Sequence, residues 1–454
     1  MAKIPFGPTY DEMLNPAAVA GEVRAKALQA LQENELDPVN LFNITWKNEA
    51  DQVRKVVLPP ELTGVYANVV VLLGYGFPSG SHKVGPAYST LIEGLVDGEI
   101  IPGEHTILGP STGNFGIGTA YISKLLGFKA VVIMPDNMSK ERYERIRKYG
   151  GVLELTPGSE SDVILTLERT HEMMKNPKNK ALAQFELFPN YRFHRHVTGN
   201  SAIEAVRGVG NGRIAGFTSA PGSAGTLAAG DQIKALFPEA KIAALEPYEC
   251  STLATGGRGQ HRIEGIGDKM CTLIHNVLAT DFVILIKDEE TVQGLKIFRD
   301  GVESLVRLGL DRDFALALRD CFGPSGIGNV LGAIKLAKFL RLGPGDNVVT
   351  VATDGFDRYQ SVLEELDCRY LETAPFVLDR WANDIFLGAK DDAVYDFRRP
   401  SVKEQLFRQK ESDWLKFGYS QQFLDSMRDQ SFWENEYAKV PHYNKKIAEM
   451  RSDR

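Results

Sequence analysis

Short apolar runs alternate with longer amphipathic segments through most of the chain. The apolar runs fall at residues 67–73, 106–108, 130–134, 152–155, 214–218, 242–245, 283–286 and 348–351. Helical patterns occur at 88–95, 116–126, 139–149, 163–174, 202–206, 226–237, 289–306 and 328–340. Short apolar strands that alternate with longer helices are typical of α/β proteins with mostly parallel sheets. We expect two open sheets flanked by helices, because so many strands would strain a single sheet.

The two ends of the chain have a different pattern. Residues 17–31 are rich in good helix formers and predict a helix, followed by extended connectors at 40–46 and 53–58. Beyond residue 371 the chain is charged and aromatic, with helical patterns and no clear strand. We therefore expect residues 371–454 to form a helical C-terminal arm. Its Trp and Tyr side chains would pack over the chain's own domain, as a helical cap, or across a subunit interface.

Composition and charge narrow the classes of function. The 454 residues are 43% hydrophobic and 24% charged, as in a globular protein, and the net charge of −7 gives no electrostatic case for binding nucleic acid or an anionic membrane. No apolar run is long enough to span a bilayer, and residues 1–10 lack the core of a signal peptide, so we expect a cytoplasmic protein. Four scattered cysteines and eight histidines show no metal-ligand spacing, so no metal site is predicted.

A single lysine stands out in the first of four small-residue loops that lie between predicted strands and helices. Lys83 belongs to the stretch 78–85, which follows the apolar run 67–73. Ligands of parallel α/β proteins bind where strands end and helices begin. A buried lysine there loses its proton easily and can act as a nucleophile or form a Schiff base. The alternative is a solvated lysine at a helix start.

The other three loops offer partners for anions. Loop 109–116 carries Ser111, Thr112 and Asn114, which suit either a carboxylate ligand or a helix N-cap. Loop 323–328 carries Ser325, again a cap or a ligand contact. Loop 220–226 has small residues that let the backbone approach a phosphate, although a simple turn fits as well, and its spacing matches no nucleotide fingerprint. Its members are Gly222, Ser223, Ala224, Gly225 and Thr226.

The order and the amino-acid sequences of these segments resemble those of the fold-type-II pyridoxal-phosphate enzymes, most of all the cysteine synthase and cystathionine β-synthase family. The resemblance extends over residues 40–365 and includes the four loops. Four further sets of residues carry it: Ile133-Met134-Pro135 and 136–142 together with 149–151; 183–186 together with 198–199; 246–247 together with 261–267; and 354–359. The resemblance implies a tryptophan synthase β-like fold. It implies a larger cofactor domain (1–103 and 199–370), a smaller mobile domain (104–198) and the extension 371–454.

The resemblance also implies a role for each site residue. Lys83 would hold pyridoxal 5′-phosphate as an internal aldimine and move protons at the substrate Cα. Asn114 would contact the ring hydroxyl, and Ser325 would face the pyridine nitrogen. Residues 222–226 would cradle the phosphate. The substrate carboxylate would be bound by Ser111, Thr112 and Gln184, with Gly265 beside the cofactor in the segment that senses the bound substrate.

The implied reaction is β-elimination or β-replacement on a small amino acid with a β leaving group, of the cysteine, serine or acylserine type, through an aminoacrylate intermediate. A neutral Ser325 at the pyridine nitrogen would stabilise a carbanion less than an Asp does and so favour prompt expulsion of the leaving group. The alternatives are an ammonia lyase or dehydratase, a thiolase subunit that uses the same cofactor, or a non-catalytic homologue, which the presence of Lys83 argues against. The family's usual state implies a homodimer, and the arm is a candidate for its interface.

Several residues depart from the family's pattern. Val84-Gly85 follow the lysine where cysteine synthases usually have Asp-Arg, and His82-Lys83 is similar to the lysine motif of tryptophan synthase β chains. Phe115 replaces a Thr and would make the site near the substrate more apolar. These departures leave the leaving group and the second reactant open.

Overall fold

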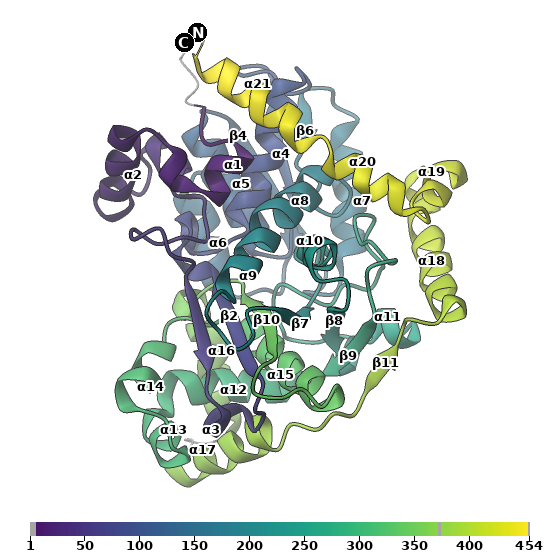
Figure 1. Cartoon of the computed structure of the whole chain (residues 1–454). Helices are drawn as coiled ribbons and strands as arrows, with labels where there is room; N and C mark the ends of the chain where they lie inside the picture. Colours follow the sequence, from purple (N-terminus) through teal and green to yellow (C-terminus); the bar gives the residue numbers. More distant parts are fainter. Residues whose placement is uncertain (1–5, 371–373, 453–454) are drawn as a thin grey trace.

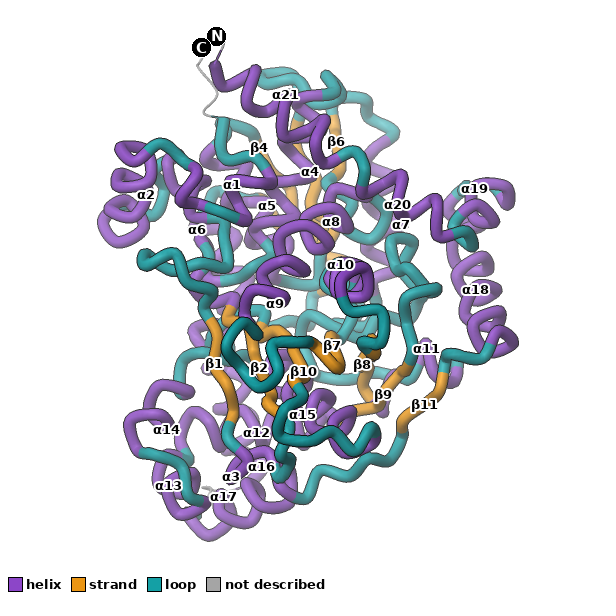
Figure 2. Tube along the Cα trace, in the orientation of Figure 1, coloured by secondary structure: helices purple, strands orange, loops and turns teal. Residues whose placement is uncertain are grey.

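The structure is a computed structural model that describes residues 6–370 and 374–452, and its strands form two sheets (Figures 1 and 2). The larger sheet has the order β1–β2–β10–β7–β8–β9–β11. Its five inner strands run parallel, whereas β1 and β11 pair antiparallel at the two edges. Its strands are β1 (Lys55–Leu58), β2 (Asn68–Leu73), β7 (Ile214–Ser219), β8 (Lys241–Pro247), β9 (Phe282–Ile286), β10 (Asn347–Ala352) and β11 (Val394–Asp396).

The smaller sheet has the order β5–β4–β3–β6, with all strands parallel. Its strands are β3 (Thr106–Pro110), β4 (Lys129–Pro135), β5 (Val152–Thr156) and β6 (Asn179–Ala181). All four fall within residues 104–198. Two mostly parallel sheets with flanking helices confirm the predicted α/β class.

Helices cover the faces of both sheets (Figure 1). In chain order they are α1 (Tyr10–Leu14), α2 (Gly21–Glu33), α3 (Pro60–Thr63), α4 (Val84–Val96), α5 (Asn114–Leu125), α6 (Lys140–Lys148), α7 (Val163–Met174), α8 (Phe188–Phe193), α9 (Gly199–Ala205), α10 (Ala228–Leu236), α11 (Thr252–Thr255), α12 (Asp288–Asp300), α13 (Val302–Leu308), α14 (Arg312–Leu318), α15 (Pro324–Phe339), α16 (Gln360–Tyr370), α17 (Pro375–Trp381), α18 (Pro400–Trp414), α19 (Gln421–Ser426), α20 (Gln430–Tyr437) and α21 (Val440–Ser452). A π-helical turn, η5 (His194–Thr198), joins α8 to α9.

The structure differs from the sequence prediction mainly in short elements. Strand β1 lies in the expected connector 53–58, β6 was not predicted, and β11 lies in the arm, where no clear strand was expected. All three are edge strands of three or four residues without a fully buried apolar run. The predicted helix 289–306 is two helices that meet at Gly301. Helix α15 begins at Pro324, where proline's fixed φ suits the first helical turn.

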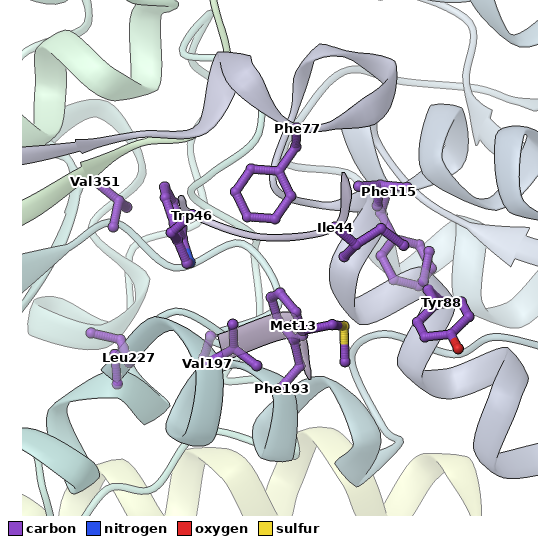
Figure 3. Close-up of a cluster of buried hydrophobic side chains, with 14 of the residues drawn as sticks. Met13, Ile44, Trp46, Phe77, Tyr88, Phe115, Phe193, Val197, Leu227 and Val351 are labelled. Atoms are coloured by element: carbon purple, nitrogen blue, oxygen red, sulfur yellow. The ribbon is translucent and has the colours of Figure 1, made fainter. Parts of the chain in front are cut away.

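An aromatic cluster from the connector 40–46 supports the loop that contains Lys83 (Figure 3). Trp46 is fully buried and packs edge-to-face on Phe77, with ring centroids 5.0 Å apart. Its other neighbour is the His82 ring at 5.3 Å, and its indole N–H donates to Thr198 Oγ1 at 3.0 Å. The connector thus fixes the residue next to the lysine.

The C-terminal arm packs against its own chain rather than projecting from it (Figure 1, yellow). Trp414 and Trp433 are fully buried in a cluster with Phe185, Tyr191 and Leu273. This favours the first of the two expected roles for the arm's aromatic residues. The predicted start of the arm at residue 371 lies outside the described residues. Within the described part of the chain, none of the helices has the length and apolarity to traverse a bilayer.

Candidate active site

Lys83 lies at the carboxyl ends of two adjacent parallel strands, as the sequence predicts. It follows β2 and directly precedes α4. The end of β10 holds the preceding turn, because the carbonyl of Thr353 accepts hydrogen bonds from Ser81 Oγ at 3.1 Å and from the His82 N–H at 3.2 Å. The side chain is half-buried and faces a narrow cavity.

This cavity brings most of the predicted residues together. Its volume is only about 20 Å³, so Lys83 and its neighbours nearly fill it. It is lined by Lys83, Ser111, Thr112, Gly113, Asn114, Phe115, Gln184, Phe185, Gly222, Ser223, Gly265 and Thr353. Four predicted residues are not among the lining residues: Ala224, Gly225, Thr226 and Ser325.

The loop 220–226, between β7 and α10, reaches the lysine through Ser223. Lys83 Nζ donates to Ser223 Oγ at 3.4 Å, and Asn190 Nδ2 donates to the same oxygen at 3.0 Å. A Cβ on Gly222 would lie 2.7 Å from the carbonyl oxygen of Gly265, and one on Gly225 would overlap Asn190 Oδ1. The loop therefore needs glycine at both positions, because neighbouring protein atoms occupy the space that a side chain would take.

Two buried histidines beside this loop have ring nitrogens without partners among the described residues. Neither nitrogen of His82 is hydrogen-bonded, nor is His194 Nε2. Because Thr198 Oγ1 accepts the Trp46 N–H, its own hydrogen is free for His194 Nδ1, 2.9 Å away. If the hydroxyl donates to Nδ1, the proton of His194 lies on Nε2. Burial lowers the pKa of both rings well below the ordinary value, so both are neutral.

These groups fit pyridoxal 5′-phosphate. A small-residue loop at a strand-to-helix junction, the unpartnered ring nitrogen Nε2 of His194 beside Gly225, and the Lys83 amine near Ser223 suit a phosphorylated aldehyde. Burial lowers the pKa of Lys83 to about 8, although Asp268 and Glu160 oppose that shift. A substantial fraction of the amine is thus neutral near pH 8, the form that attacks a carbonyl.

The loop 111–114 presents its side chains mainly to the protein. Ser111 Oγ accepts the backbone N–H of Gly113 at 2.9 Å and of Gly116 at 2.8 Å, which is the capping role that was the alternative at this position. Gln184 Nε2 donates to the carbonyl of Pro110 at 3.2 Å. Ser111 and Gln184 nevertheless line the cavity.

Asn114 is fixed from both ends of its amide group. Its Nδ2 donates to Asp354 Oδ2 at 2.5 Å, and its Oδ1 accepts from Arg358 Nη1 at 2.6 Å. Both partners come from the segment 354–359 that carries part of the family resemblance. This orientation places a rigid amide at the cavity wall.

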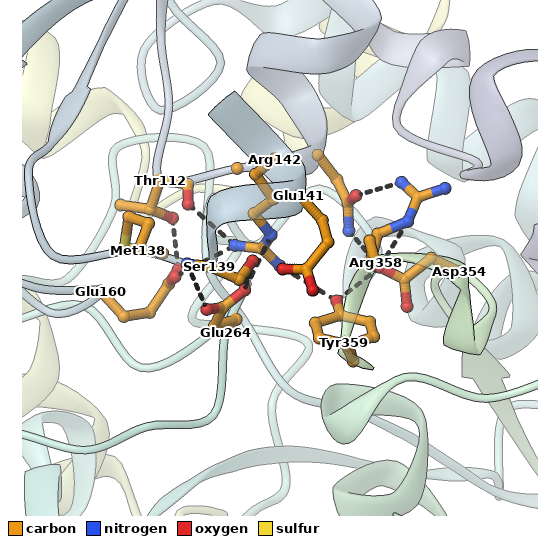
Figure 4. A network of polar contacts seen from close by, with 12 residues as sticks. Thr112, Met138, Ser139, Glu141, Arg142, Glu160, Glu264, Asp354, Arg358 and Tyr359 are labelled. Atoms are coloured by element: carbon orange, nitrogen blue, oxygen red, sulfur yellow. Dashed lines mark hydrogen bonds and ion pairs between the residues drawn. The ribbon is translucent and has the colours of Figure 1, made fainter. Parts of the chain in front are cut away.

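A buried ionic network lies behind this loop (Figure 4). Arg142 Nε pairs with Glu264 at 2.9 Å, and its Nη1 donates to the Thr112 carbonyl at 2.9 Å. Glu160 accepts a hydrogen bond from Thr112 Oγ1 and lies 3.5 Å from Arg142. Burial raises the pKa of Glu160 to about 8 despite Arg142. Tyr359 closes the network by accepting from Arg142 Nη2 at 3.0 Å.

Sequence reasoning missed several residues of this site. Asp268 is buried near Lys83, its Oδ2 has no partner in the described chain, and burial raises its pKa to about 7. Glu160, Asn190 and Thr272 were also missed. None stands in a recognisable motif, and the only signal was the position of Asp268 directly after the glycine-rich segment 265–267. Ser325 is buried in the first turn of α15, and its expected contact with the pyridine nitrogen stays a prediction.

The fold and the donor set define a pyridoxal-phosphate enzyme, and comparison with known proteins agrees. The chain belongs to the family of pyridoxal-phosphate dependent enzymes, whose model matches residues 63–354. It is 31% identical to a probable cysteine synthase of Bacillus subtilis (strain 168), over 65% of this chain and 89% of that protein. It is 32% identical to a cysteine synthase of Staphylococcus aureus (strain N315), over 65% and 88%.

Solved structures share the fold. O-acetyl serine sulfhydrylase isoform 3 of Entamoeba histolytica superimposes with a TM-score of 0.62 at 22% identity, covering 78% of this chain and 96% of that one. A hydrogen sulfide-producing enzyme of Fusobacterium nucleatum gives a TM-score of 0.57 at 28% identity, covering 69% and 88%. The matched family region ends before the C-terminal arm.

Proposed function

We propose that this enzyme carries out β-elimination or β-replacement on a small amino acid of the cysteine, serine or acylserine type. The observation that carries the proposal is the convergence of Lys83, the loop 111–114 and Ser223 on one cavity. Relatives named as cysteine synthases and O-acetylserine sulfhydrylases support the same reaction class. The particular leaving group and the second reactant are left to experiment.

The proposed roles follow the geometry. Lys83 holds the cofactor covalently and, once displaced, moves the proton at the substrate Cα, which its lowered pKa allows. Residues 222–226 bind the phosphate, while Asn114 and Ser325 contact the ring. Ser111, Thr112 and Gln184 bind the substrate carboxylate, and Gly265 lies beside the cofactor, in the segment that senses the bound substrate. The cofactor, when bound, supplies the electron sink for the Cα carbanion.

We propose that an outer pocket is the route to the cavity. This pocket of about 400 Å³ contains Ser139, Glu160, Arg262 and Glu264. The hydrogen bond between Glu160 and Thr112 separates it from the narrow cavity. Substrate entry would require this wall to part, and its closure would exclude water during the reaction.

The domain division and the assembly belong to the same proposal. We assign residues 1–103 and 199–370 to the larger domain, 104–198 to a mobile smaller domain, and 371–454 to the extension. Movement of the smaller domain would widen the narrow cavity. We also propose a cytoplasmic homodimer, which size-exclusion chromatography with light scattering and cell fractionation would test.

The central test is the Lys83→Ala variant, with Lys148→Ala as a control at an exposed lysine. Wild type and control should develop a visible absorbance band with pyridoxal phosphate, and borohydride should fix the cofactor to residue 83. Lys83→Ala should lose the fixed cofactor and at least 10³-fold in activity, as expected when a covalent catalyst is removed. A band that survives in Lys83→Ala would refute the assignment.

A screen of amino acids then separates the reaction classes. Spectral change and product formation with cysteine, serine or an acylserine, but not with threonine or diaminopropionate, would support the proposal. The reverse pattern would favour an ammonia lyase or dehydratase, and reaction only with an acyl thioester would favour a thiolase subunit.

A further inference from the structure

The last part of the C-terminal arm, residues 400–452 (α18–α21), contacts segments that hold the active-site loops, although it lies beyond the matched family region, which ends at residue 354. Figure 1 shows it running along the outside of the molecule from β11, past α8 and α10, toward the N-terminal helices. Two sets of contacts lead from the arm to Ser223, which belongs to the loop 220–226, called the phosphate loop below for its proposed role.

The first set holds the segment 268–276, which forms no helix or strand and needs outside partners for its backbone. Asp413 Oδ2 accepts the Cys271 N–H at 3.0 Å, and Trp414 Nε1 donates to the Cys271 carbonyl at 2.8 Å. Lys410 Nζ donates to the His275 carbonyl at 2.8 Å. All three arm side chains are buried.

The buried arm residues that hold the segment include charged side chains, unlike those of a helix that only covers apolar surface. Burying an ammonium and a carboxylate costs free energy unless each finds good hydrogen bonds, so apolar side chains would serve a simple cover better. Burial lowers the pKa of Lys410 to about 8, a sign of how far it is removed from water. The partners that Lys410 and Asp413 find in the segment are backbone groups, so they fix its path whatever its side chains are.

The held segment touches the site in two places. Thr272 Oγ1 donates to the Ser223 carbonyl at 3.0 Å, so the segment fixes the phosphate loop from one side. Asp268 lies at the start of the segment, and its carboxylate acts electrostatically on the Lys83 amine. A shift of the segment would therefore move both the phosphate loop and the charge beside the lysine.

The second set of contacts reaches Ser223 from the opposite side. Glu434 and Glu436 of α20 pair with Arg195 at 2.6 Å and with Arg192 at 2.7 Å. These arginines belong to η5 and α8, and α8 also carries Asn190, which donates to Ser223 Oγ. The carbonyl of Ser223 is thus held by the segment 268–276, and its hydroxyl is held by α8. The arm contacts these two segments through different residues.

We propose that the C-terminal arm is a positioning element of the active site, in which Lys410, Asp413 and Trp414 hold the segment 268–276 and thereby fix Ser223 and Asp268 against Lys83. The inference rests on the proposed function for its consequence on cofactor binding. Its mechanical part, the coupling of the arm to the phosphate loop, is independent of the reaction.

The test uses the full-length protein with Trp414→Phe and, as a second variant, Asp413→Ala. The matched control is Arg428→Met, which removes ion pairs to Glu404 and Glu411 inside the arm and touches neither the segment nor the loop. Hydrogen exchange is measured without cofactor for amides 219–226 and 268–276, and the affinity for pyridoxal phosphate is measured by absorbance titration.

Both variants should speed exchange in both segments and weaken cofactor affinity by roughly tenfold, as loss of one such hydrogen bond allows. Arg428→Met should leave amides 219–226 unchanged. The inference is overturned if exchange rises only in 268–276, or if all three variants act alike. Coupled exchange in a protein that binds no pyridoxal phosphate would support the positioning role and refute the proposed function.

Discussion

Lys83 works in an environment that balances burial against negative charge. Burial lowers the pKa of its amine to about 8, while the carboxylates of Asp268 and Glu160 act in the opposite direction. Each of these acids is itself buried with a raised pKa. The amine therefore changes its charge near pH 8 rather than near 10, which suits the proposed role of Lys83 as both nucleophile and base.

The rate of cofactor attachment to the apoprotein should report this balance. With a pKa of about 8, roughly a tenth of the Lys83 amine is neutral at pH 7, so the rate should rise about tenfold to pH 9 and then level off. Asp268→Asn removes a charge that favours the ammonium form, so its rate curve should shift to lower pH. Stopped-flow absorbance between pH 6 and 10 gives both curves, and a wild-type rate still climbing at pH 10 would contradict the prediction.

How much of the site a sequence can predict depends on how its residues are held. Lys83, Asn114 and the loop 222–226 stand in local patterns at strand-to-helix junctions, so the sequence alone can single them out as candidates. Glu160 reaches Thr112 across 48 residues, and Thr272 reaches Ser223 across 49. Such contacts are set by how the two sheets and the irregular segments pack, which no local pattern records.

Two neighbouring residues of the phosphate loop differ in what limits their side chains: backbone conformation at Ala224 and space at Gly225. Ala224 has a φ of +65°, a region in which a side chain is strained. Gly225, by contrast, needs its missing side chain for space, because a methyl group there would overlap Asn190. The strained conformation at Ala224 turns the loop backbone between Ser223 and α10, and strain of this kind collects at functional sites.

Single substitutions at these two positions should therefore change the free energy of unfolding in opposite directions. Ala224→Gly should relieve the strain and raise the free energy of unfolding by about 1 kcal/mol, with cofactor affinity kept. Gly225→Ala should displace Asn190, lower stability by about 2 kcal/mol and weaken cofactor affinity at least tenfold. Denaturant unfolding and absorbance titration measure both. Equal stability changes of the same sign would show that the loop's backbone conformation is not what the structure describes.

At the element scale, the prediction was most successful for buried parallel strands and least for edges. The inner strands β2 and β10 consist of buried apolar runs, which a sequence displays directly. Strands β1, β6 and β11 are short, and their burial is partial, so their residues look like connectors. Pairing with a neighbour, rather than their own composition, makes them strands.

In the whole molecule, the two sheets meet through a set of polar contacts around the outer pocket. The Ser361 N–H and hydroxyl donate to Glu141 at 2.9 and 2.6 Å. Ser139 donates through its N–H and its hydroxyl to Glu264, both at 2.9 Å. Because Ser139 and Glu141 belong to the proposed smaller domain, these bonds would hold the closed form.

Glu141→Ala should loosen that closure. Loss of two half-buried hydrogen bonds should cost about 1–2 kcal/mol of closure free energy and speed cofactor release about tenfold. The matched control is Lys140→Ala, since the exposed pair of Lys140 with Glu364 at 3.9 Å is worth little. Cofactor exchange into an excess of apo-acceptor protein measures release, and equal rates in both variants would argue against a closing movement.

The arm helices α18–α21 follow all strands of both sheets in the described part of the chain, which bears on when the active site is assembled. Every parallel strand of both sheets is synthesised before residue 400. A chain still emerging from the ribosome can form its sheets, since domains generally fold as units in order of synthesis. In that chain, Ser223 would still lack the indirect contacts with α18 and α20 that run through the segment 268–276 and through α8. On the proposed positioning role of the arm, tight binding of the cofactor would therefore follow translation of α18 and α20.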